Sequence, residues 1–372
     1  MEDQITIVAV GHRSRARRNS VERVEIVRGG PSCGTIAVLI MQNRRIVLAS
    51  RPDGEPRVDN FRLETTSLPE VPFGRVLVQN LYLSIDPYMR GRMSDRPSYA
   101  RPVGIGEVMV GGTVGRVVQS NGSDVGIGKL LVGYGGWQEY SVFNPSDANV
   151  LPVPHDLPPS AALGVAGMPG ATAYLGLSKI GEPKAGETVV VSAAAGAVGS
   201  VVGQIAKLEG CRVVGVAGGP EKCRYVTSHL GFDACVDHRS PSMAADLRAA
   251  CPNGVDVYFE NVGGKVLEAV APLLNSGSRV PICGFISQYN EANPVTPFTV
   301  LGALPHPPVH RFFLVSEWPE EYRAVVERLS HWVREGKLKY TEDVSEGLEQ
   351  GPRALIGVLR GENFGKKIVK LA

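Results

Sequence analysis

Hydrophobic and polar positions follow two different patterns along the chain. Between residues 44 and 143, short apolar runs alternate with turns rich in glycine and proline, which is typical of antiparallel strands. From residue 187 the apolar runs become continuous, and segments with helical spacing separate them. Continuous apolar strands joined by helices indicate a parallel sheet covered on both faces. The pattern therefore predicts two domains of different architecture.

The first pattern predicts a mostly antiparallel, barrel-like domain. A connection rich in proline follows it at 150–159, and we place the domain boundary shortly after, so that this domain comprises residues 41–165. The last segment, 337–372, returns to short β-like pieces, and we expect it to rejoin the same domain. The strands expected in the first part are residues 45–49, 75–83, 108–119 and 137–143.

The second pattern predicts an α/β domain with a parallel, doubly wound sheet over residues 166–336. A loop at 286–310 precedes its last strand. The helices are expected at 197–209, 221–230 and about 319–335. The strands are expected at 188–193, 212–217, 234–238, 255–260, 279–285 and 311–315.

The first forty residues differ from both domains. Arginines interrupt their apolar runs, and their acidic residues do not fit a transit peptide. Six arginines against four acidic residues here account for the whole net charge of +2. We expect residues 1–40 to form a disordered, dispensable extension, with Met41 as the start of the protein. An additional docked strand at 36–40 is the alternative.

Composition is that of an ordinary globular protein, with 43% hydrophobic and 20% charged residues in a chain of 372. No run approaches the roughly 18 apolar residues that indicate a membrane-spanning helix. The small net charge gives no reason to expect nucleic acid or a membrane as partner. Six cysteines stand singly, without a C-x-x-C pair, which argues against a disulfide framework and structural zinc and favours the cytoplasm.

The strongest local motif is a glycine-rich turn within residues 189–200, Val-Val-Val-Ser-Ala-Ala-Ala-Gly-Ala-Val-Gly-Ser. Ala193, Gly196 and Gly199 have A-x-x-G-x-x-G spacing between a predicted strand and a predicted helix. Such a turn brings backbone N–H groups at a helix N-terminus close to a pyrophosphate. We therefore expect a dinucleotide site rather than a simple tight turn. The turn residues expected to contact the cofactor are Ala193, Gly196, Ala197, Val198 and Gly199.

The end of the next strand indicates which dinucleotide is bound. An NAD site would offer Asp or Glu there, whereas this chain has Ala217-Gly218-Gly219, followed by Lys222 and Arg224. Small residues leave room for a 2′-phosphate, and a cation balances its charge. We therefore expect NADPH, with Gly218 and Lys222 at the phosphate. An ordinary surface lysine is the alternative for Lys222.

Several further stretches have sequences typical of one superfamily, namely 47–52, 81–93, 217–222, 256–264, 283–290 and 361–366. Together with the turn, they resemble the medium-chain dehydrogenase/reductase superfamily. Within it, the resemblance is to leukotriene/prostaglandin reductases, plant double-bond reductases and bacterial curcumin reductases. It covers about residues 43–372 and implies a Rossmann cofactor domain, a GroES-like substrate domain and a homodimer.

Zinc-dependent members of that superfamily carry an early Cys and a later Gly-His-Glu, where this chain has residues 84–88 and 104–108 without Cys or His. The ligands of a Lewis-acid zinc are therefore missing, and zinc-dependent alcohol oxidation is not expected. Conjugate reduction needs less polarisation, because the enolate formed by hydride addition requires only hydrogen-bond donors. We expect a zinc-independent, NADPH-dependent reductase that adds hydride to the β-carbon of a small-molecule α,β-unsaturated ketone or aldehyde.

The resemblance also implies catalytic residues. Tyr289 matches a tyrosine near the nicotinamide, while Tyr88 and Tyr99 match positions that line the substrate pocket. Each tyrosine could instead form part of the pocket wall without taking part in chemistry.

Further cofactor contacts follow from the same resemblance, at Asn261, Cys283 and Tyr289. Asn363 matches a residue that reaches the cofactor from the tail, with a turn residue as the alternative. His238 stands where relatives often have a tyrosine close to the 2′-phosphate. His238 or the following Arg239 could bind phosphate, and binding by His238 would depend on pH, although a core or surface histidine is the simpler interpretation.

Two other functions remain open at this stage. One is a zinc-free quinone reductase of the same superfamily, and the other is a cofactor-binding structural protein without turnover. The stretches 86–90 and 286–290 favour the enone branch. Oxidation of NADPH with a simple enone would separate a reductase from a protein that only binds the cofactor.

Overall fold

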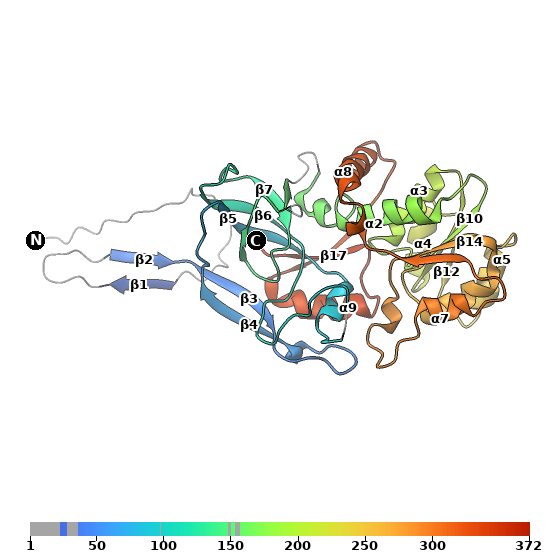
Figure 1. The fold of residues 1–372 in the computed structure, drawn as a ribbon, viewed down its shortest axis with the longest axis horizontal. Helices are drawn as coiled ribbons and strands as arrows, with labels where there is room; N and C mark the ends of the chain where they lie inside the picture. The colour runs from blue at the N-terminus through green and yellow to red at the C-terminus, as the bar shows by residue number, and fades with distance from the viewer. Residues whose placement is uncertain (1–22, 28–35, 97, 148–149, 153–156) are drawn as a thin grey trace, which may run out of the picture.

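The computed structural model describes residues 23–27 and 36–372, apart from 97, 148–149 and 153–156. Figure 1 shows an elongated molecule with a barrel-like lobe beside a layered α/β lobe. The C-terminal segment returns from the second lobe to the first. Within the described ranges, no helix is both long and apolar enough to cross a membrane.

The α/β lobe is built on a six-stranded sheet in the described chain, in the order β12-β11-β10-β13-β14-β15. Every neighbouring pair in it is parallel. This order confirms the doubly wound sheet. The strands are β10 (Thr188–Ser192), β11 (Arg212–Ala217), β12 (Ala234–Asp237), β13 (Val255–Phe259), β14 (Leu274–Ile282) and β15 (Val309–Phe312).

Helices cover both faces of this sheet, because successive strand residues point to opposite sides. Val189 and Val191 pack in one core cluster with α2, α3 and α8, whereas Val190 packs in another with α5, α6 and α7. The helices of this lobe are α2 (Met168–Gly176), α3 (Gly199–Leu208), α4 (Pro220–Ser228), α5 (Met243–Ala250), α6 (Gly264–Val270), α7 (Pro297–Gly302) and α8 (Pro319–Arg334).

The barrel-like lobe contains a sheet in the order β16-β17-β5-β6-β7-β9, with β8 also paired to β5, and a separate β3–β4 pair. All of these pairs are antiparallel except β16–β17. The strands are β3 (Gln42–Leu48), β4 (Phe61–Ser67), β5 (Arg75–Ser84), β6 (Thr113–Asn121), β7 (Leu130–Gly133), β8 (Tyr140–Phe143), β9 (Leu151–Pro152), β16 (Glu342–Glu346) and β17 (Lys366–Lys370).

The last segment confirms one expectation and corrects another. Strand β17 pairs antiparallel with β5, so the tail does rejoin the first lobe. The expectation of β-like pieces alone was wrong, because α9 (Gly351–Leu359) is a helix. Its proline lies in the first turn, where a missing N–H is tolerated, and its apolar residues at helical spacing pack beside Trp137.

Short helical turns complete the chain. α1 (Tyr88–Arg92) follows β5 in the barrel-like lobe, and η5 begins shortly after the end of β14. The 3-10 turns are η1 (Val58–Asn60), η2 (Pro159–Leu163), η4 (Ala271–Leu273), η5 (Ile286–Gln288), η6 (Val315–Glu317) and η7 (Leu348–Gln350), and a π-helical turn η3 (Leu177–Gly181) extends α2.

Part of the first forty residues differs from the expected disordered extension. β1 (Arg23–Val27) and β2 (Ile36–Ile40) pair with each other in an antiparallel ribbon that projects from the barrel-like lobe in Figure 1. Both segments are rich in β-branched residues, which favour strands. A strand at 36–40 is therefore present, but it pairs with β1 instead of docking on a body sheet. Residues 1–22 and 28–35 lie outside the described residues.

Candidate cofactor site and active site

The glycine-rich turn joins β10 to α3 in a tight reversal. Ala193 follows the strand with a φ of 51°, a left-handed conformation that costs an L-residue about 1–2 kcal/mol. A Cβ atom at Gly199 would lie 2.4 Å from the carbonyl oxygen of Ala193. Only glycine fits there, and its presence allows the helix to begin directly beside the strand end.

The N-terminus of α3 has no side-chain cap, because its N-cap residue Val198 supplies none. Gly196, Ala197 and Val198 are only half-buried, so the outer side of the turn is accessible. N–H groups in the first turn of a helix carry partial positive charge. The predicted residues 193–199 thus form a turn that suits a pyrophosphate.

The C-terminal tail runs along the same turn. The N–H of Gly365 donates to the carbonyl of Ala195 at 2.9 Å, and Gly365 is bridged to Gly196. The side-chain amide of Asn363 donates to the carbonyl of Gly365 at 2.8 Å. The structure therefore brings Asn363 to the glycine-rich turn, while its amide nitrogen also stabilises the tail's own bend.

Three basic residues gather beyond the ends of β11 and β12, and we call Lys222, His238 and Arg239 the basic cluster. Arg239 interacts electrostatically with both Lys222 and His238, and Lys222 also interacts with His238. A Cβ atom at Gly218 would lie 2.8 Å from Nε2 of His238 and 3.2 Å from Nε of Arg239. The absence of a side chain at Gly218 therefore allows both side chains to approach the strand end.

A backbone carbonyl and the carboxylate of Asp237 hold the basic cluster in place. The ammonium of Lys222 donates to the carbonyl of Gly361 in the tail at 2.8 Å. Asp237 accepts hydrogen bonds from the N–H groups of Gly219 at 2.8 Å and Arg239 at 2.9 Å, and so ties the two strand ends together. The described part of the chain contains no ion pair within 4.0 Å between the cluster and an acid.

Burial and repulsion within the basic cluster lower the pKa values of Lys222 and His238. Burial lowers the pKa of Lys222, and the neighbouring Arg239 lowers it further. Burial and Arg239 also lower the pKa of His238, and Asp237 opposes this only in part. A bound anion would relieve this repulsion, which is the electrostatic property expected of a phosphate site.

Asn261 is fixed at the end of β10 by a buried network. Its side-chain amide donates to the carbonyl of Ser192 at 2.8 Å, and its N–H donates to the hydroxyl of Ser192 at 2.8 Å. That hydroxyl donates to the fully buried Glu260 at 3.0 Å. Burial raises the pKa of Glu260, although N–H groups of Gly263 and Val262 donate to its carboxyl.

Cys283 and Tyr289 lie beyond the carboxyl end of β14, on either side of η5. A Cβ atom at Gly284 would lie 2.7 Å from the Tyr289 hydroxyl, so the ring folds back over the strand end. Burial raises the pKa of Tyr289, with Cys283 as a second cause. Burial raises the pKa of the Cys283 thiol to about 12. Both groups therefore stay protonated at neutral pH.

Tyr88 and Tyr99 approach from the barrel-like lobe. Tyr99 interacts electrostatically with both Tyr88 and Tyr289, and we call these three residues the tyrosine cluster. The guanidinium of Arg92 lies over both rings, 5.9 Å from the centroid of Tyr88 and 4.7 Å from that of Tyr99. Burial raises the pKa of Tyr88 well above its usual value. Its hydroxyl is buried without a hydrogen-bond partner among the described residues, so it is a donor that a substrate oxygen could satisfy.

Two residues beside the candidate site, Glu260 and Lys366, were not singled out from the sequence. Glu260 anchors Asn261 through Ser192. The buried ammonium of Lys366 donates to Asp86 at 2.8 Å, which joins the tail to the segment before α1. The strand that contains Lys366 has two further lysines, so its sequence gave no signal for Lys366, and Glu260 carried no signal beyond its place after a buried strand.

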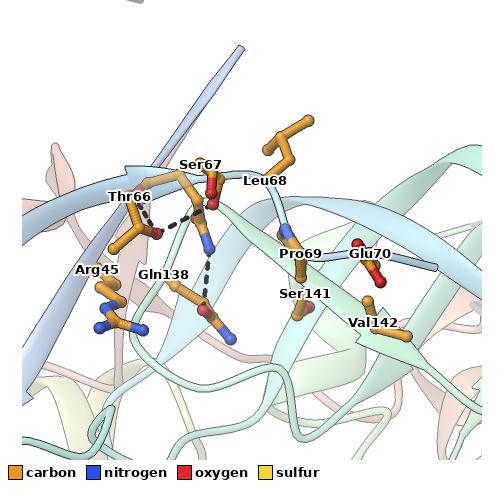
Figure 2. A pocket seen from close by; sticks show the side chains of 10 residues that line it. Arg45, Thr66, Ser67, Leu68, Pro69, Glu70, Gln138, Ser141 and Val142 are labelled. Carbon is orange, nitrogen blue, oxygen red and sulfur yellow. Dashed lines mark hydrogen bonds between the residues drawn. The ribbon is translucent and has the colours of Figure 1, made fainter. Parts of the chain in front are cut away.

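The structure also has a cavity of about 470 Å³ on the barrel-like lobe, shown in Figure 2. Its polar groups are bonded to one another, since Asn43 donates to Gln138 at 3.1 Å and Thr66 to the backbone of Ser67 at 3.1 Å. None of the predicted site residues lines it. Its lining is Asn43, Arg45, Thr66, Ser67, Leu68, Pro69, Glu70, Gln138, Ser141 and Val142.

A search of the described residues for metal ligands finds no group of three or more His, Cys, Asp or Glu side chains that could hold a metal ion. Among the cysteines, Cys211 and Cys251 are buried, and Cys223, Cys235 and Cys283 are partly buried.

Comparison with protein families matches both lobes. Residues 44–151 match a family described as the N-terminal domain of oxidoreductase, and residues 197–331 match one described as zinc-binding dehydrogenase.

Characterised relatives are similar over most of the chain. The NADPH-dependent curcumin reductase of Escherichia coli (strain K12) is 50% identical over 339 residues, which cover 89% of this chain and 97% of that protein. Prostaglandin reductase 1 of Rattus norvegicus is 43% identical, covering 89% and 100% respectively. The NADP(+)-dependent 2-alkenal reductase of Nicotiana tabacum is 38% identical, covering 89% and 98%.

Solved structures show the same similarity. CurA from Vibrio vulnificus in complex with NADPH superposes with a TM-score of 0.84 and 49% identity, covering 88% of this chain and 99% of that one. A quinone oxidoreductase from Pseudomonas syringae pv. Tomato DC3000 has a TM-score of 0.72 at 19% identity, which reflects the shared fold alone.

Proposed function

The chain belongs to the medium-chain dehydrogenase/reductase superfamily, in the branch of the curcumin, prostaglandin and 2-alkenal reductases, and we propose that it uses NADPH to reduce the carbon–carbon double bond of α,β-unsaturated ketones and aldehydes. One observation carries this proposal. A basic cluster that forms no ion pair among the described residues and a cluster of neutral tyrosine hydroxyls lie near the carboxyl edge of the same parallel sheet, where ligands of doubly wound folds bind.

The residues present fit NADPH. The turn at 193–199 and the uncapped start of α3 would hold the pyrophosphate. Lys222, His238 and Arg239 would hold the 2′-phosphate, and the missing side chain of Gly218 lets His238 and Arg239 approach the strand end. Asn261, Cys283 and Asn363 would complete the cofactor site. The name of the Escherichia coli relative and the NADPH bound to the Vibrio vulnificus protein support this choice of cofactor.

NADPH, when bound, supplies the hydride that is added to the β-carbon of the substrate. The protein's part in the reaction is to stabilise the negative charge that then develops on the carbonyl oxygen. Tyr289 and Tyr88 have hydroxyls that remain protonated because burial raises their pKa, so each can donate a hydrogen bond to that oxygen. The guanidinium of Arg92 packs over the ring of Tyr99 next to them. Water or a tyrosine then protonates the α-carbon.

The test is steady-state oxidation of NADPH with a simple enone and a simple enal, followed by identification of the product. We expect a saturated ketone or aldehyde whose β-carbon carries the label when deuterated NADPH is used. An allylic alcohol as product would contradict the proposal, because it requires hydride addition to the carbonyl carbon. Turnover of quinones but not enones would favour a quinone reductase, and cofactor binding without any turnover would favour a structural role.

A further inference from the structure

Arg90 in α1 is a buried cation without an acidic partner. Only 7% of the residue is exposed, and burial lowers its pKa, with Arg96 as a second cause. No carboxylate among the described residues lies within ion-pair distance of it. Burying an unpaired charge is costly, so this arginine requires an explanation beyond general packing.

Two neutral oxygens from opposite lobes accept its hydrogen bonds. Its Nη2 donates to the carbonyl of Gly54 at 2.8 Å, and its Nε donates to the side-chain oxygen of Asn290 at 3.0 Å. Gly54 belongs to the barrel-like lobe, whereas Asn290 lies in the loop that follows β14 of the α/β lobe. Arg90 therefore crosses between the lobes, and its planar guanidinium fixes both partners at once.

The contact lies next to residues of the tyrosine cluster on both sides. Tyr88 opens the same short helix two residues before Arg90, and Tyr289 directly precedes Asn290. A shift of Asn290 relative to α1 would therefore move Tyr289 relative to Tyr88. Misplacement of reacting groups by about 1 Å can cost a hundredfold in rate.

We propose that Arg90 is a positioning residue, which holds the Tyr289 loop against α1 so that the tyrosine hydroxyls of the two lobes act on one substrate oxygen. This inference rests on the proposed enone reduction. Arg90 acts through Asn290 and does not itself contact the substrate. A second cross-lobe contact provides the matched control, because the exposed Arg96 donates to the backbone of the next residue, Glu291, at 3.4 Å.

The experiment compares Arg90→Met, Arg90→Lys, Asn290→Ala, the double variant Arg90→Met/Asn290→Ala and the control Arg96→Gln. The readouts are kcat, KM for a simple enone, NADPH affinity, melting temperature and the primary isotope effect on kcat with NADPH deuterated at the transferred position. Asn290→Ala leaves the buried arginine in place, so it tests the contact even if Arg90→Met does not fold.

We expect Arg90→Met and Asn290→Ala each to lower kcat by about ten- to a hundredfold, while NADPH affinity changes by less than about threefold. The isotope effect should rise, because a misaligned pair makes hydride transfer slower than the other steps. The double variant should be no slower than Arg90→Met, since both changes remove one contact. Arg90→Lys should recover only part of the rate, and Arg96→Gln should behave like the wild type.

Three results would overturn the inference. The first is normal kcat in folded Asn290→Ala, and the second is rate losses that multiply in the double variant. The third is a fall in melting temperature with unchanged kcat and isotope effect, which would make Arg90 a stabilising residue only. A wild-type protein that reduces no enone would instead refute the proposed function, so the two failures can be distinguished.

Discussion

The basic cluster and the tyrosine cluster lie near the same edge of one sheet but differ in the charge of their side chains. In the basic cluster, Arg239 lowers the pKa of both Lys222 and His238, as expected for cations that repel one another. In the tyrosine cluster, burial raises the pKa of Tyr88, Tyr99 and Tyr289, which keeps their hydroxyls neutral. One region therefore suits attraction of a permanent anion, and the other suits donation to a charge that exists only during a reaction.

This difference separates binding from chemistry along one site. Interactions present before and during the reaction strengthen binding, whereas interactions made only to the developing charge raise the rate. Changes in the basic cluster should accordingly alter cofactor affinity and selectivity. Changes in the tyrosine cluster should alter turnover and leave cofactor affinity almost unaffected.

Removal of the Tyr289 hydroxyl should have the largest effect. We expect Tyr289→Phe to lower kcat/KM for enone reduction by about ten- to a thousandfold, because one donor to the developing oxyanion is lost. NADPH affinity and melting temperature should change little, since the ring and its edge contact with Phe285 remain. Steady-state kinetics and cofactor titration measure both quantities. Unchanged kinetics would mean that Tyr289 contributes only packing. Tyr88 would then be the next hydroxyl donor to test.

Removal of the Lys222 ammonium should have the next largest effect, which we expect on the affinity for NADPH. A charge-assisted hydrogen bond contributes about 1.5–3 kcal/mol, so Lys222→Ala should weaken NADPH binding by about ten- to a hundredfold. NADH binding and kcat at saturating NADPH should stay nearly constant. Isothermal titration with both cofactors provides the measurement. Equal losses for NADPH and NADH would mean that the contact with Gly361 supports the fold instead.

The titration of His238 should give a smaller, pH-dependent effect. Burial lowers the pKa of His238 in the folded protein below its ordinary value of 6.5. The unfolded chain therefore binds the proton more readily, and His238 lowers the free energy of unfolding as the pH falls below 6.5. A phosphate would favour the protonated ring. The preference for NADPH over NADH should therefore grow between pH 8 and pH 6 relative to a His238→Gln variant, by about threefold at most. Parallel curves for the two proteins would exclude His238 from the phosphate site.

Chelation of metal ions should have no effect on either cluster. The donors proposed for the reaction are hydroxyl groups, and the described residues contain no group of ligands for a metal. Activity after dialysis against a chelator should equal that of the untreated enzyme, and elemental analysis should find no stoichiometric zinc. A loss of activity that added zinc restores would require a different account of carbonyl polarisation.

Local sequence was sufficient for several elements of the α/β lobe. Strand β11 has the predicted bounds, and β10, β12 and α8 differ from prediction by a residue or two at their ends. These elements follow from contiguous residues, because apolar periodicity reflects which faces are buried. The helix α9 was missed, and so was α7, which lies inside the predicted loop at 286–310. Strand β2 corresponds to the alternative given for residues 36–40, whereas its partner β1 was missed.

The sequence by itself determined the glycine-rich turn and the tyrosines at strand and helix ends. Gly199 is required by a contact six residues away along the same turn, so its reason is local and can be read from spacing. Only the tertiary structure decided which distant residues meet, such as Lys222 with Gly361, Lys366 with Asp86 and Arg90 with Asn290. These contacts join segments from 139 to 280 residues apart, and their partners depend on how two separately patterned lobes pack, which no local periodicity encodes.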